Sequence, residues 1–353
     1  MAALWSLPGW ARAEAKAEKP LDLLILGGTG FIGPHEINYA LSRGHRVTMF
    51  NRGKTAPDMF PDVERLIGDR GGDLDALKGR DWDAVIDNSG FYPRHAKLSA
   101  ELLDGHVGKY MFVASIDVYA EDSLTVEDDE FSAAYAVMDD PTDESESPYG
   151  PSYGARKALC EQEVVRVFGD NAINIRPGII TGTGDPTERL RHWLERLVVG
   201  NEILVPGQED LQVQYIDAAD MCGWMVRLLE EGTGSGPYNA VGGRDPYIAR
   251  PFLEGLVEST ESNSTLTWIP WEWIREQTDE RVRYGPWYGH GPDPFMQVNN
   301  DRAQAAGLTF RPIADTDSDM IANLEGYEPK WGRGGFDLDT EAELLAKWHA
   351  EQD

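Results

Sequence analysis

The clearest pattern along the chain is an alternation of short apolar runs with amphipathic stretches. Residues 23–26 form an uninterrupted apolar run that ends at Gly27, as in a parallel strand that is buried on both faces. An amphipathic stretch over 32–43 follows, and residues 46–50 form a second apolar run. Strand, helix and strand in this order predict one βαβ unit.

The same alternation continues beyond this unit. Further strands are expected at 83–86, 109–113 and 173–175, and helices at 93–105, 154–168 and 217–231. Alternating strands and helices predict an α/β fold with a Rossmann-type doubly wound parallel sheet. Beyond residue 178 the pattern becomes irregular and rich in Gly and Pro, which favours a smaller C-terminal substrate-binding domain.

The pattern therefore divides the chain into a tail and two domains. No Lys or Arg occurs between Tyr110 and Ala155, and we interpret this dense acidic region as a mobile or lid-like surface insertion. The expected parts are a tail or signal remnant at 1–20, a Rossmann domain at 21–178 with an acidic insertion at about 120–150 and completed by about 214–242, and a substrate-binding domain at 179–213 and 243–353.

The first twenty residues bear on location. Ala11-Arg12-Ala13 resembles the cleavage site of an export signal, but the basic leader and the long apolar region of such a signal are missing. We therefore expect a frayed tail on a cytoplasmic protein, with an exported or periplasmic protein as the alternative. No run approaches the roughly 18 apolar residues that cross a bilayer, so we expect no membrane-spanning segment.

Charge and cysteine content exclude several classes of function. The chain has 353 residues with 61 Asp and Glu against 32 Lys and Arg, and the net charge of −29 repels phosphate backbones and anionic lipid surfaces. We therefore expect a small-molecule substrate as the partner, with no nucleic acid and no membrane. Cys160 and Cys222 are too few for a disulfide framework, and scattered His, Asp and Glu show no metal-ligand spacing, so no metal is expected.

A glycine-rich segment lies between the first strand and the first helix. Glycines at this point permit a tight turn and a close approach of the backbone to a pyrophosphate at the helix N-terminus. The context of strand, loop, helix and second strand makes this a dinucleotide site rather than a structural turn alone. The segment is Gly27-Gly28-Thr29-Gly30-Phe31-Ile32-Gly33, and the expected contacts come from Gly27, Gly30, Phe31, Ile32 and Gly33.

The end of the second strand indicates which dinucleotide is bound. An NAD-binding fold usually places an acidic residue there, but this chain has Asn51-Arg52. Arg52 could pair with a 2′-phosphate, which favours NADP over NAD, the alternative being a solvated surface arginine. Asp69, after a further strand, could accept a hydrogen bond from the adenine amino group, or it caps a turn.

Three polar residues point to acid/base chemistry. Tyr153 and Lys157 are four residues apart and share one face of a helix. A nearby ammonium favours the phenolate of a tyrosine, whose ordinary pKa is about 10, and this makes the tyrosine usable as a general acid/base. Ser115 follows the strand at 109–113, so it is expected at the carboxyl edge of the sheet, where ligands bind.

With these motifs in order, the chain resembles the extended branch of the short-chain dehydrogenase/reductase superfamily, the NAD-dependent epimerase/dehydratase-like proteins. The resemblance spans about residues 21–245, and the last hundred residues match only loosely. The matching elements are the glycine-rich segment, Ser115 four residues before Tyr119, the Tyr153/Lys157 pair, Arg176-Pro177-Gly178, and Gln214-Tyr215-Ile216-Asp217-Ala218-Ala219-Asp220.

The resemblance implies an enzyme that transfers hydride between a nicotinamide and a carbon bearing a hydroxyl or carbonyl. Tyr153 would be the acid/base, Lys157 would bind the nicotinamide ribose and lower the Tyr153 pKa, and Ser115 would orient the substrate oxygen. The family's sugar dehydratases carry an acid where Ile116 stands, so dehydration is disfavoured. Relatives often pair, which implies a possible homodimer by analogy alone.

The substrate and the outcome of the reaction stay open. Asp117 could act as a base or be a loop carboxylate, and Thr187 and Arg189 lie where relatives begin to contact substrate. We expect a small, polar, sugar-like substrate and an oxidoreductase of carbohydrate metabolism, working as an epimerase that recycles its cofactor or as a reductase/dehydrogenase. The alternative is a non-catalytic nucleotide-binding or RNA-associated protein, because Arg52-Gly53-Lys54 is similar to a segment of RNA-associated plastid proteins.

Overall fold

The computed structural model divides into two compact units. The first comprises Met1–Gly178, Ala218–Val241 and Val298–Thr309, and the second comprises Ile179–Asp217, Gly242–Gln297 and Phe310–Asp353. Residues 298–309, which the sequence pattern assigned to the substrate-binding domain, group with the first unit because the helix they contain packs on a strand of its sheet. The structure describes residues 15–120, 129–140, 142–243, 246–278, 293–322 and 334–352.

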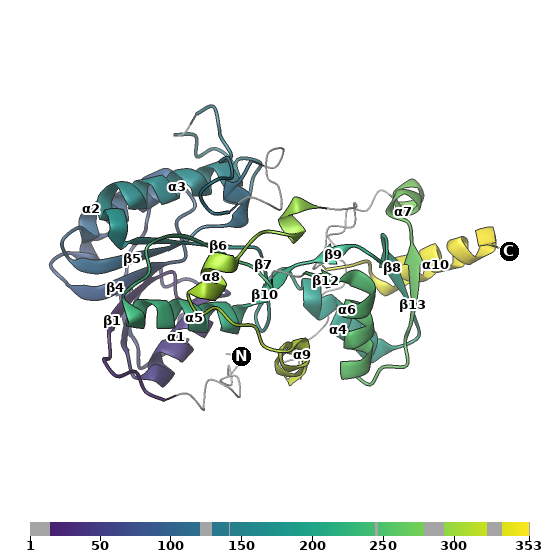
Figure 1. The fold of residues 1–353 in the computed structure, drawn as a ribbon. Helices are drawn as coiled ribbons and strands as arrows, with labels where there is room; N and C mark the ends of the chain where they lie inside the picture. The colour runs from purple at the N-terminus through teal and green to yellow at the C-terminus, as the bar shows by residue number, and fades with distance from the viewer. Residues whose placement is uncertain are drawn as a thin grey trace. The chain divides into compact units, whose positions relative to one another are not determined.

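The first unit contains the expected doubly wound sheet, in which all seven strands are parallel (Figure 1). Their spatial order is β11-β6-β5-β4-β1-β2-β3. This Rossmann-like order confirms the predicted fold class. The strands are β1 Asp22–Leu26, β2 Arg46–Asn51, β3 Glu64–Ile67, β4 Trp82–Asp87, β5 Val107–Val113, β6 Ala172–Pro177 and β11 Gly236–Ala240.

Helices cover both faces of this sheet. The helices α2 and α3 pack together on one face, and α1 and α5 pack together on the other (Figure 1). The strand order reverses between β1 and β4, where Leu26 is paired with Asp87, and ligands bind at such a point. The helices of this unit are α1 Gly33–Arg43, α2 Pro93–Leu103, α3 Tyr153–Phe168, α5 Ala218–Glu231 and the short α8 Asp301–Ala305.

The segment before β1 is attached to the end of α1. The backbone N–H of Ala17 donates to the carbonyl of Arg43 (2.9 Å), and Lys16 Nζ donates to the carbonyl of Ser42 (2.8 Å). The described end of the tail is therefore fixed rather than frayed. The predicted cleavage-like site at 11–13 lies outside the described residues.

The acidic insertion is also anchored where it is described. Tyr135 bridges to Tyr119, and the N–H of Ala136 donates to the carbonyl of Val118 (2.7 Å). Arg176, at the end of β6, donates from Nη2 to the Tyr135 hydroxyl (2.6 Å) and from Nη1 to the Glu130 carbonyl (3.0 Å). Residues 129–140 are mostly exposed, as expected of a surface insertion, and a buried arginine binds Glu130 and Tyr135 to the sheet edge; their lid-like role stays a prediction.

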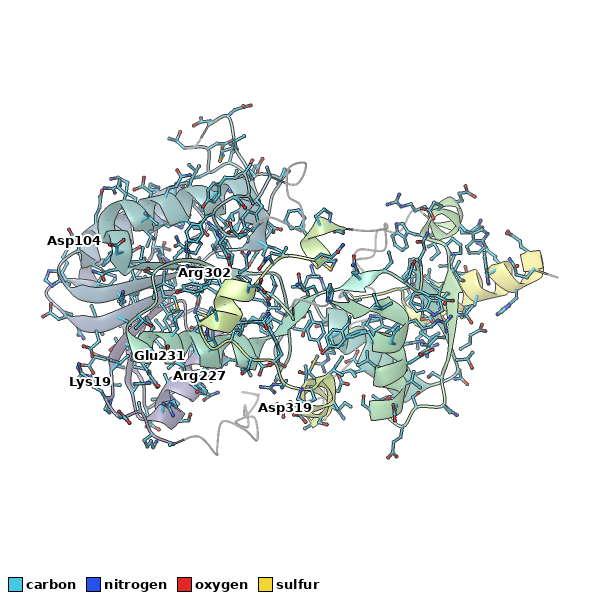
Figure 2. All side chains as sticks on the ribbon, in the orientation of Figure 1. Lys19, Asp104, Arg227, Glu231, Arg302 and Asp319 are labelled. Carbon is cyan, nitrogen blue, oxygen red and sulfur yellow. The ribbon has the colours of Figure 1, made fainter. Side chains whose placement is uncertain are left out.

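The second unit has short paired strands in place of one sheet. They pair as β7 Ile179–Thr181 with β10 Tyr215–Asp217, β8 Glu202–Pro206 with β13 Thr265–Ile269, and β9 Gln212–Val213 with β12 Tyr247–Ile248. An apolar core that includes Trp193 and Phe336 joins these pairs to helices. Figure 2 draws the side chains of both units as sticks. The helices are α4 Arg189–Val199, α6 Ala249–Ser259, α7 Trp271–Gln277, α9 Ile313–Ala322 and α10 Leu338–Gln352.

Short 3₁₀ turns complete the described structure. They lie at Asp75–Leu77, Ile116–Val118, Gly169–Asn171 and Pro294–Met296, and the second of these, η3, directly follows β5. Within the described part of the chain, no helix is both long and apolar enough to cross a membrane.

Candidate active site

The glycine-rich loop connects β1 to α1 and brings the helix close to the loop backbone. A Cβ atom at Gly33 would lie 2.5 Å from the carbonyl carbon of Gly28, so only glycine permits this packing. A Cβ at Gly30 would meet nothing nearer than the Gly27 oxygen at 3.9 Å, so the loop is open at that point. Ile32 caps α1 without a side-chain hydrogen bond, Pro34 has no N–H, and the N–H groups of His35 and Glu36 donate to the Ile32 carbonyl (3.0 and 3.2 Å), so the Gly33 N–H is the amide of this first turn that is left for a ligand.

Asn51 and Arg52 lie at the carboxyl end of β2, the strand next to this loop. Asn51 Oδ1 accepts from the N–H of Gly53 (2.8 Å), and its buried Nδ2 has no partner within the described residues. Arg52 is exposed, and no hydrogen bond or ion pair engages it in the described part of the chain. The open loop, the uncapped helix and these donors fit a dinucleotide.

Asp69 lies beyond β3 and caps a turn. Its Oδ1 accepts from the N–H of Gly71 (2.8 Å), and its backbone bridges to Asp73. The structure thus shows the turn-capping role, which was one of the two interpretations of this residue. The side chain is exposed, and its contact with adenine stays a prediction.

Tyr153 and Ser115 are brought together by the packing of α3 on the turn after β5. A Cβ at Gly154 would lie 1.9 Å from the carbonyl oxygen of Asp117, so this glycine lets the start of α3 approach the turn. The Ser115 hydroxyl lies near enough to the Tyr153 hydroxyl to lower the pKa of that phenol. Ser115 is 7% exposed, and its Oγ also accepts from the N–H of Asp117 (3.2 Å).

Lys157 lies one turn further along α3 and is 2% exposed. Its Nζ donates to the carbonyls of Val113 (2.5 Å) and Gly90 (3.1 Å). The ammonium also lies 4.5 Å and 5.2 Å from the ring centres of Phe112 and Phe91. Burial lowers the Lys157 pKa to about 8.

Lys157 was predicted to lower the Tyr153 pKa, but in the chain by itself that pKa is raised. Burial, reinforced by the nearby Asp117 carboxylate, raises the Tyr153 pKa well above its ordinary value, and the Ser115 hydroxyl opposes this only partly. The reason is geometric, because the Lys157 ammonium is held by two backbone carbonyls and two aromatic rings. Tyr153 is therefore a protonated phenol at neutral pH.

Two predicted substrate residues lie in the second unit. The hydroxyl of Thr187 donates to both carboxylate oxygens of Asp185 (2.7 and 2.8 Å), and Arg189 begins α4. Asp117, the third, is exposed beside Tyr153 in the first unit. No group of His, Cys, Asp and Glu within the described ranges is arranged to hold a metal ion.

Sequence reasoning missed a buried polar network between β4 and β5. Arg70 donates to both carboxylate oxygens of Asp87 and to the hydroxyl of Ser99 (2.8 Å), and Tyr110 donates to Asp87 Oδ2 (2.7 Å). Asp87 ends β4 and is paired with Leu26, the residue directly before the glycine-rich loop, so the network lies next to that loop. The only signal in the sequence is a charged residue that ends an apolar strand.

Comparisons with known proteins agree with this arrangement. The model of the NAD dependent epimerase/dehydratase family matches residues 23–241. A 3-beta-hydroxysteroid dehydrogenase of Mycolicibacterium neoaurum is 25% identical over 210 residues, which cover 54% of this chain and 56% of that relative. The chain therefore spans about half the length of this curated relative.

Solved structures share the fold at low sequence identity. The NAD complex of UDP-glucose 4-epimerase from Thermus thermophilus is 16% identical, with a TM-score of 0.61 over 87% of this chain and 100% of that chain. WbmG of Bordetella bronchiseptica, in complex with NAD and UDP, is 13% identical, with a TM-score of 0.62 over 91% of this chain and 98% of that chain.

Proposed function

Since the chain belongs to the NAD dependent epimerase/dehydratase family, we propose that it is an NAD(P)-dependent oxidoreductase acting on a small, polar, sugar-like substrate. The reaction is hydride transfer at a carbon that bears a hydroxyl or a carbonyl. The observation that carries this proposal is the close packing of the start of α3, which bears Tyr153 and Lys157, on the turn after β5, which bears Ser115.

Ser115, Tyr153 and Lys157 have different roles in this reaction. Ser115 donates a hydrogen bond that orients the substrate oxygen, and Tyr153 gives a proton to that oxygen or takes one from it. The nicotinamide, when bound, supplies or accepts the hydride. Lys157 would bind the nicotinamide ribose. Because the Tyr153 pKa is raised, the phenol holds its proton at neutral pH, which suits reduction of a carbonyl.

Replacing Tyr153 with Phe tests this assignment. The variant keeps the ring but lacks the proton donor, so kcat should fall by about 10²–10⁴-fold, the usual contribution of general acid/base catalysis. Binding of NADH or NADPH, measured by fluorescence titration, should stay unchanged. Full turnover by the variant would remove Tyr153 from the mechanism, and failure of the wild type to bind either nucleotide would overturn the proposed function.

Exposed Arg52 supports NADPH and a reductase in preference to a recycled NAD and an epimerase. Changing Arg52 to Ala should weaken NADPH binding by about 10–100-fold, since hydrogen bonds to charged groups are worth roughly 1.5–3 kcal/mol. NADH binding should not change. Tightly held NAD(H), released when the purified protein is denatured, would point instead to the epimerase, as would equal affinity of the wild type for the two reduced nucleotides.

The remaining residues bear on substrate recognition. Asp117 lies near the Tyr153 hydroxyl and would bind or deprotonate a substrate hydroxyl. Thr187, whose hydroxyl donates to Asp185, and Arg189, at the start of α4, stay predicted substrate contacts from the sequence.

A further inference from the structure

Phe91 is a half-buried aromatic residue that contacts Lys157 from outside α3. It follows β4 and precedes α2. Its ring centre lies 5.2 Å from Lys157 Nζ and 5.2 Å from the ring centre of Tyr149, with 69° between the two ring planes. The Tyr149 ring centre lies 5.6 Å from that of Tyr153. Side-chain contacts therefore lead from Lys157 through Phe91 and Tyr149 to Tyr153, in addition to the turn of α3 that connects the pair.

The Lys157 ammonium is buried without a carboxylate bonded to it in the described part of the chain. Its Nζ donates to the carbonyls of Val113 (2.5 Å) and Gly90 (3.1 Å), and the Phe112 ring centre lies 4.5 Å away. Two neutral carbonyl groups and two aromatic rings therefore replace the water that an exposed ammonium would bind. Such a site keeps a lysine charged only if these groups together compensate for the lost hydration.

The two rings that contact the ammonium differ in what else explains their position. Phe112, on β5, is 0% exposed and is one of the core residues. Gly90 permits the approach of the loop to this ring, since a Cβ there would lie 2.6 Å from Phe112 Cε2. Phe91, the next residue, is only half-buried at the end of the sheet. Core packing therefore explains the position of Phe112, whereas Phe91 gains less from burial and contacts the cation at the edge of the site.

The charge of Lys157 is close to being lost at neutral pH. Burial is the largest influence and lowers the Lys157 pKa to about 8. Nearby carboxylates favour the ammonium and a nearby guanidinium disfavours it. The face of an aromatic ring attracts a cation, most strongly where water is excluded, so the rings also favour the charged form. The titratable and charged groups that act on Lys157 are Cys160 and Glu161 on α3, Asp87 at the end of β4, and Arg70 beyond β3.

We propose that Phe91 is a positioning residue, whose ring holds the Lys157 ammonium in its charged form one turn along α3 from Tyr153. This inference rests on the proposed function, in which Lys157 binds the nicotinamide ribose. Phe91 acts through Lys157 and transfers no proton itself. A leucine at this position would keep Lys157 buried but would lack the ring face that attracts the cation, so the lysine would lose its proton at a lower pH.

NMR titration of Lys157 tests this proposal directly. The full chain is labelled with ¹³C at the lysine Cε atoms, and the Lys157 signal is identified by its loss in Lys157→Met. In Phe91→Leu the midpoint of the Lys157 titration should fall by about one pH unit, the size expected for loss of one cation–π contact in a desolvated site. Phe91→Tyr keeps the ring face and should retain the wild-type midpoint.

A matched control comes from a second phenylalanine that contacts a cation. The Phe131 ring centre lies 5.1 Å from the Arg302 guanidinium, and Phe131 is 66% exposed. Phe131→Leu therefore removes a contact of the same kind away from Lys157, and it should leave the Lys157 midpoint unchanged. An unchanged midpoint in Phe91→Leu overturns the proposal. A shift that is equally large in Phe91→Tyr also overturns it, because the effect would then come from packing and not from the ring face.

Fluorescence titration of the same proteins with NADPH, between pH 7 and pH 9.5, separates this proposal from the proposed function. NADPH affinity of the wild type should fall as Lys157 loses its charge, and at the wild-type midpoint Phe91→Leu should bind NADPH about fivefold more weakly, as a shift of one unit requires. If NADPH affinity follows the Lys157 titration but that titration ignores Phe91, only the role of Phe91 fails. If the Lys157 titration depends on Phe91 while Lys157→Met binds NADPH as the wild type does, the ribose contact of the proposed function fails and the role of Phe91 stands.

Discussion

Two buried arginine–carboxylate pairs, Arg70–Asp87 in the first unit and Arg196–Glu341 in the second, have carboxylate pKa values that are shifted in opposite directions. A further pair in the first unit, Arg176–Glu161, has a raised carboxylate pKa like that of Glu341, so the contrast is one between pairs. In the first unit, Asp87 is 0% exposed and its pKa is lowered, because Arg70, the Tyr110 hydroxyl and the N–H of Ser89 together outweigh the cost of burial. In the second unit, burial outweighs Arg196 and the N–H of Leu204, so the pKa of Glu341 is raised.

The opposite pKa shifts of the two carboxylates come from the number and geometry of the hydrogen-bond donors that each carboxylate accepts from. Asp87 accepts from two nitrogens of Arg70, from a phenol at 2.7 Å and from a backbone amide at 3.1 Å. Glu341 accepts from Arg196 Nε at 3.1 Å on each oxygen and from the Leu204 amide at 3.1 Å, and Arg196 Nη2 lies 3.0 Å from Oε1. A buried ion pair is therefore not a fixed unit of stability, because its surroundings decide which charge state is favoured.

A third buried carboxylate extends the series. Glu36, on the first turn of α1, is 0% exposed and accepts from Asn88 Nδ2 (2.6 Å). No arginine among the described residues pairs with it, and burial raises its pKa to about 8, with a further contribution from the negative Asp87. Glu36 is therefore neutral at pH 7 and adds no negative charge beneath the loop where a pyrophosphate would bind.

The largest expected effect comes from Asp87→Asn. This change leaves the Arg70 charge buried without its counter-ion, so the free energy of unfolding should fall by about 3–5 kcal/mol at pH 7. Because the folded pKa of Asp87 is lowered, the wild type's advantage is present above the ordinary pKa of Asp and is lost as pH falls through the folded value.

Denaturant unfolding of both proteins at pH 7 and at pH 3 measures this effect. Asp81→Asn is the control, since Asp81 is 80% exposed in its pair with His106 and should change stability little. An Asp87→Asn protein as stable as the wild type at pH 7 would break the distinction between the two pairs.

Glu36→Gln should increase the stability of the folded protein, whereas Asp87→Asn should decrease it. A glutamine can donate to the Asn88 carbonyl oxygen, which has no partner among the described residues, and it stays neutral at all pH values. The wild type's protonated acid contributes stability that is fully present below the ordinary pKa of Glu and is lost as pH rises toward about 8. The melting temperature of the variant should therefore rise relative to that of the wild type as the pH increases from 5 to 8.

Calorimetry at pH 5, 6.5, 8 and 9 tests this expectation. The difference between the two melting temperatures should grow up to about pH 8 and then stay constant, since both folded and unfolded wild type are ionised above the folded pKa. A difference that is independent of pH would show that Glu36 is ionised in the folded protein across this range.

The contrast between the units also explains what the sequence could predict. The strands β1 and β2 were expected within one residue of their observed ends, because a long apolar run, a glycine loop and an amphipathic helix are local patterns. The pair β9 and β12 has two residues in each strand and joins positions 212–213 to 247–248, so no periodicity marks it. Its stability comes from the surrounding core.

Some features of the candidate site could likewise be predicted from the sequence and others could not. Ser115, Tyr153 and Lys157 could be named because their spacing follows the strand and the helix that carry them. The raised pKa of Tyr153 and the contact between Phe91 and Lys157 could not, because both depend on burial and on partners far along the chain. The Arg70–Asp87 pair could not be predicted either, because its two members are seventeen positions apart in the sequence and meet only in the folded sheet.

The smallest expected effect is that of Glu341→Gln, the partner of Asp87→Asn in the comparison. Because the folded pKa of Glu341 is raised, the wild type's relative stability falls as pH rises from the ordinary pKa of Glu through the folded value. Arg196 keeps the carbonyls of Gly200 and Glu202 as acceptors in the variant. Glu341→Gln leaves the buried Arg196 without its counter-ion, which is destabilising, but the raised pKa shows that the surroundings already disfavour the charge of Glu341. The free energy of unfolding at pH 7 should therefore fall by less than in Asp87→Asn, by about 1 kcal/mol, which is the contribution of one hydrogen bond. Denaturant unfolding at pH 5 and pH 8 measures it, and a loss as large as that of Asp87→Asn would mean that the two pairs are alike after all.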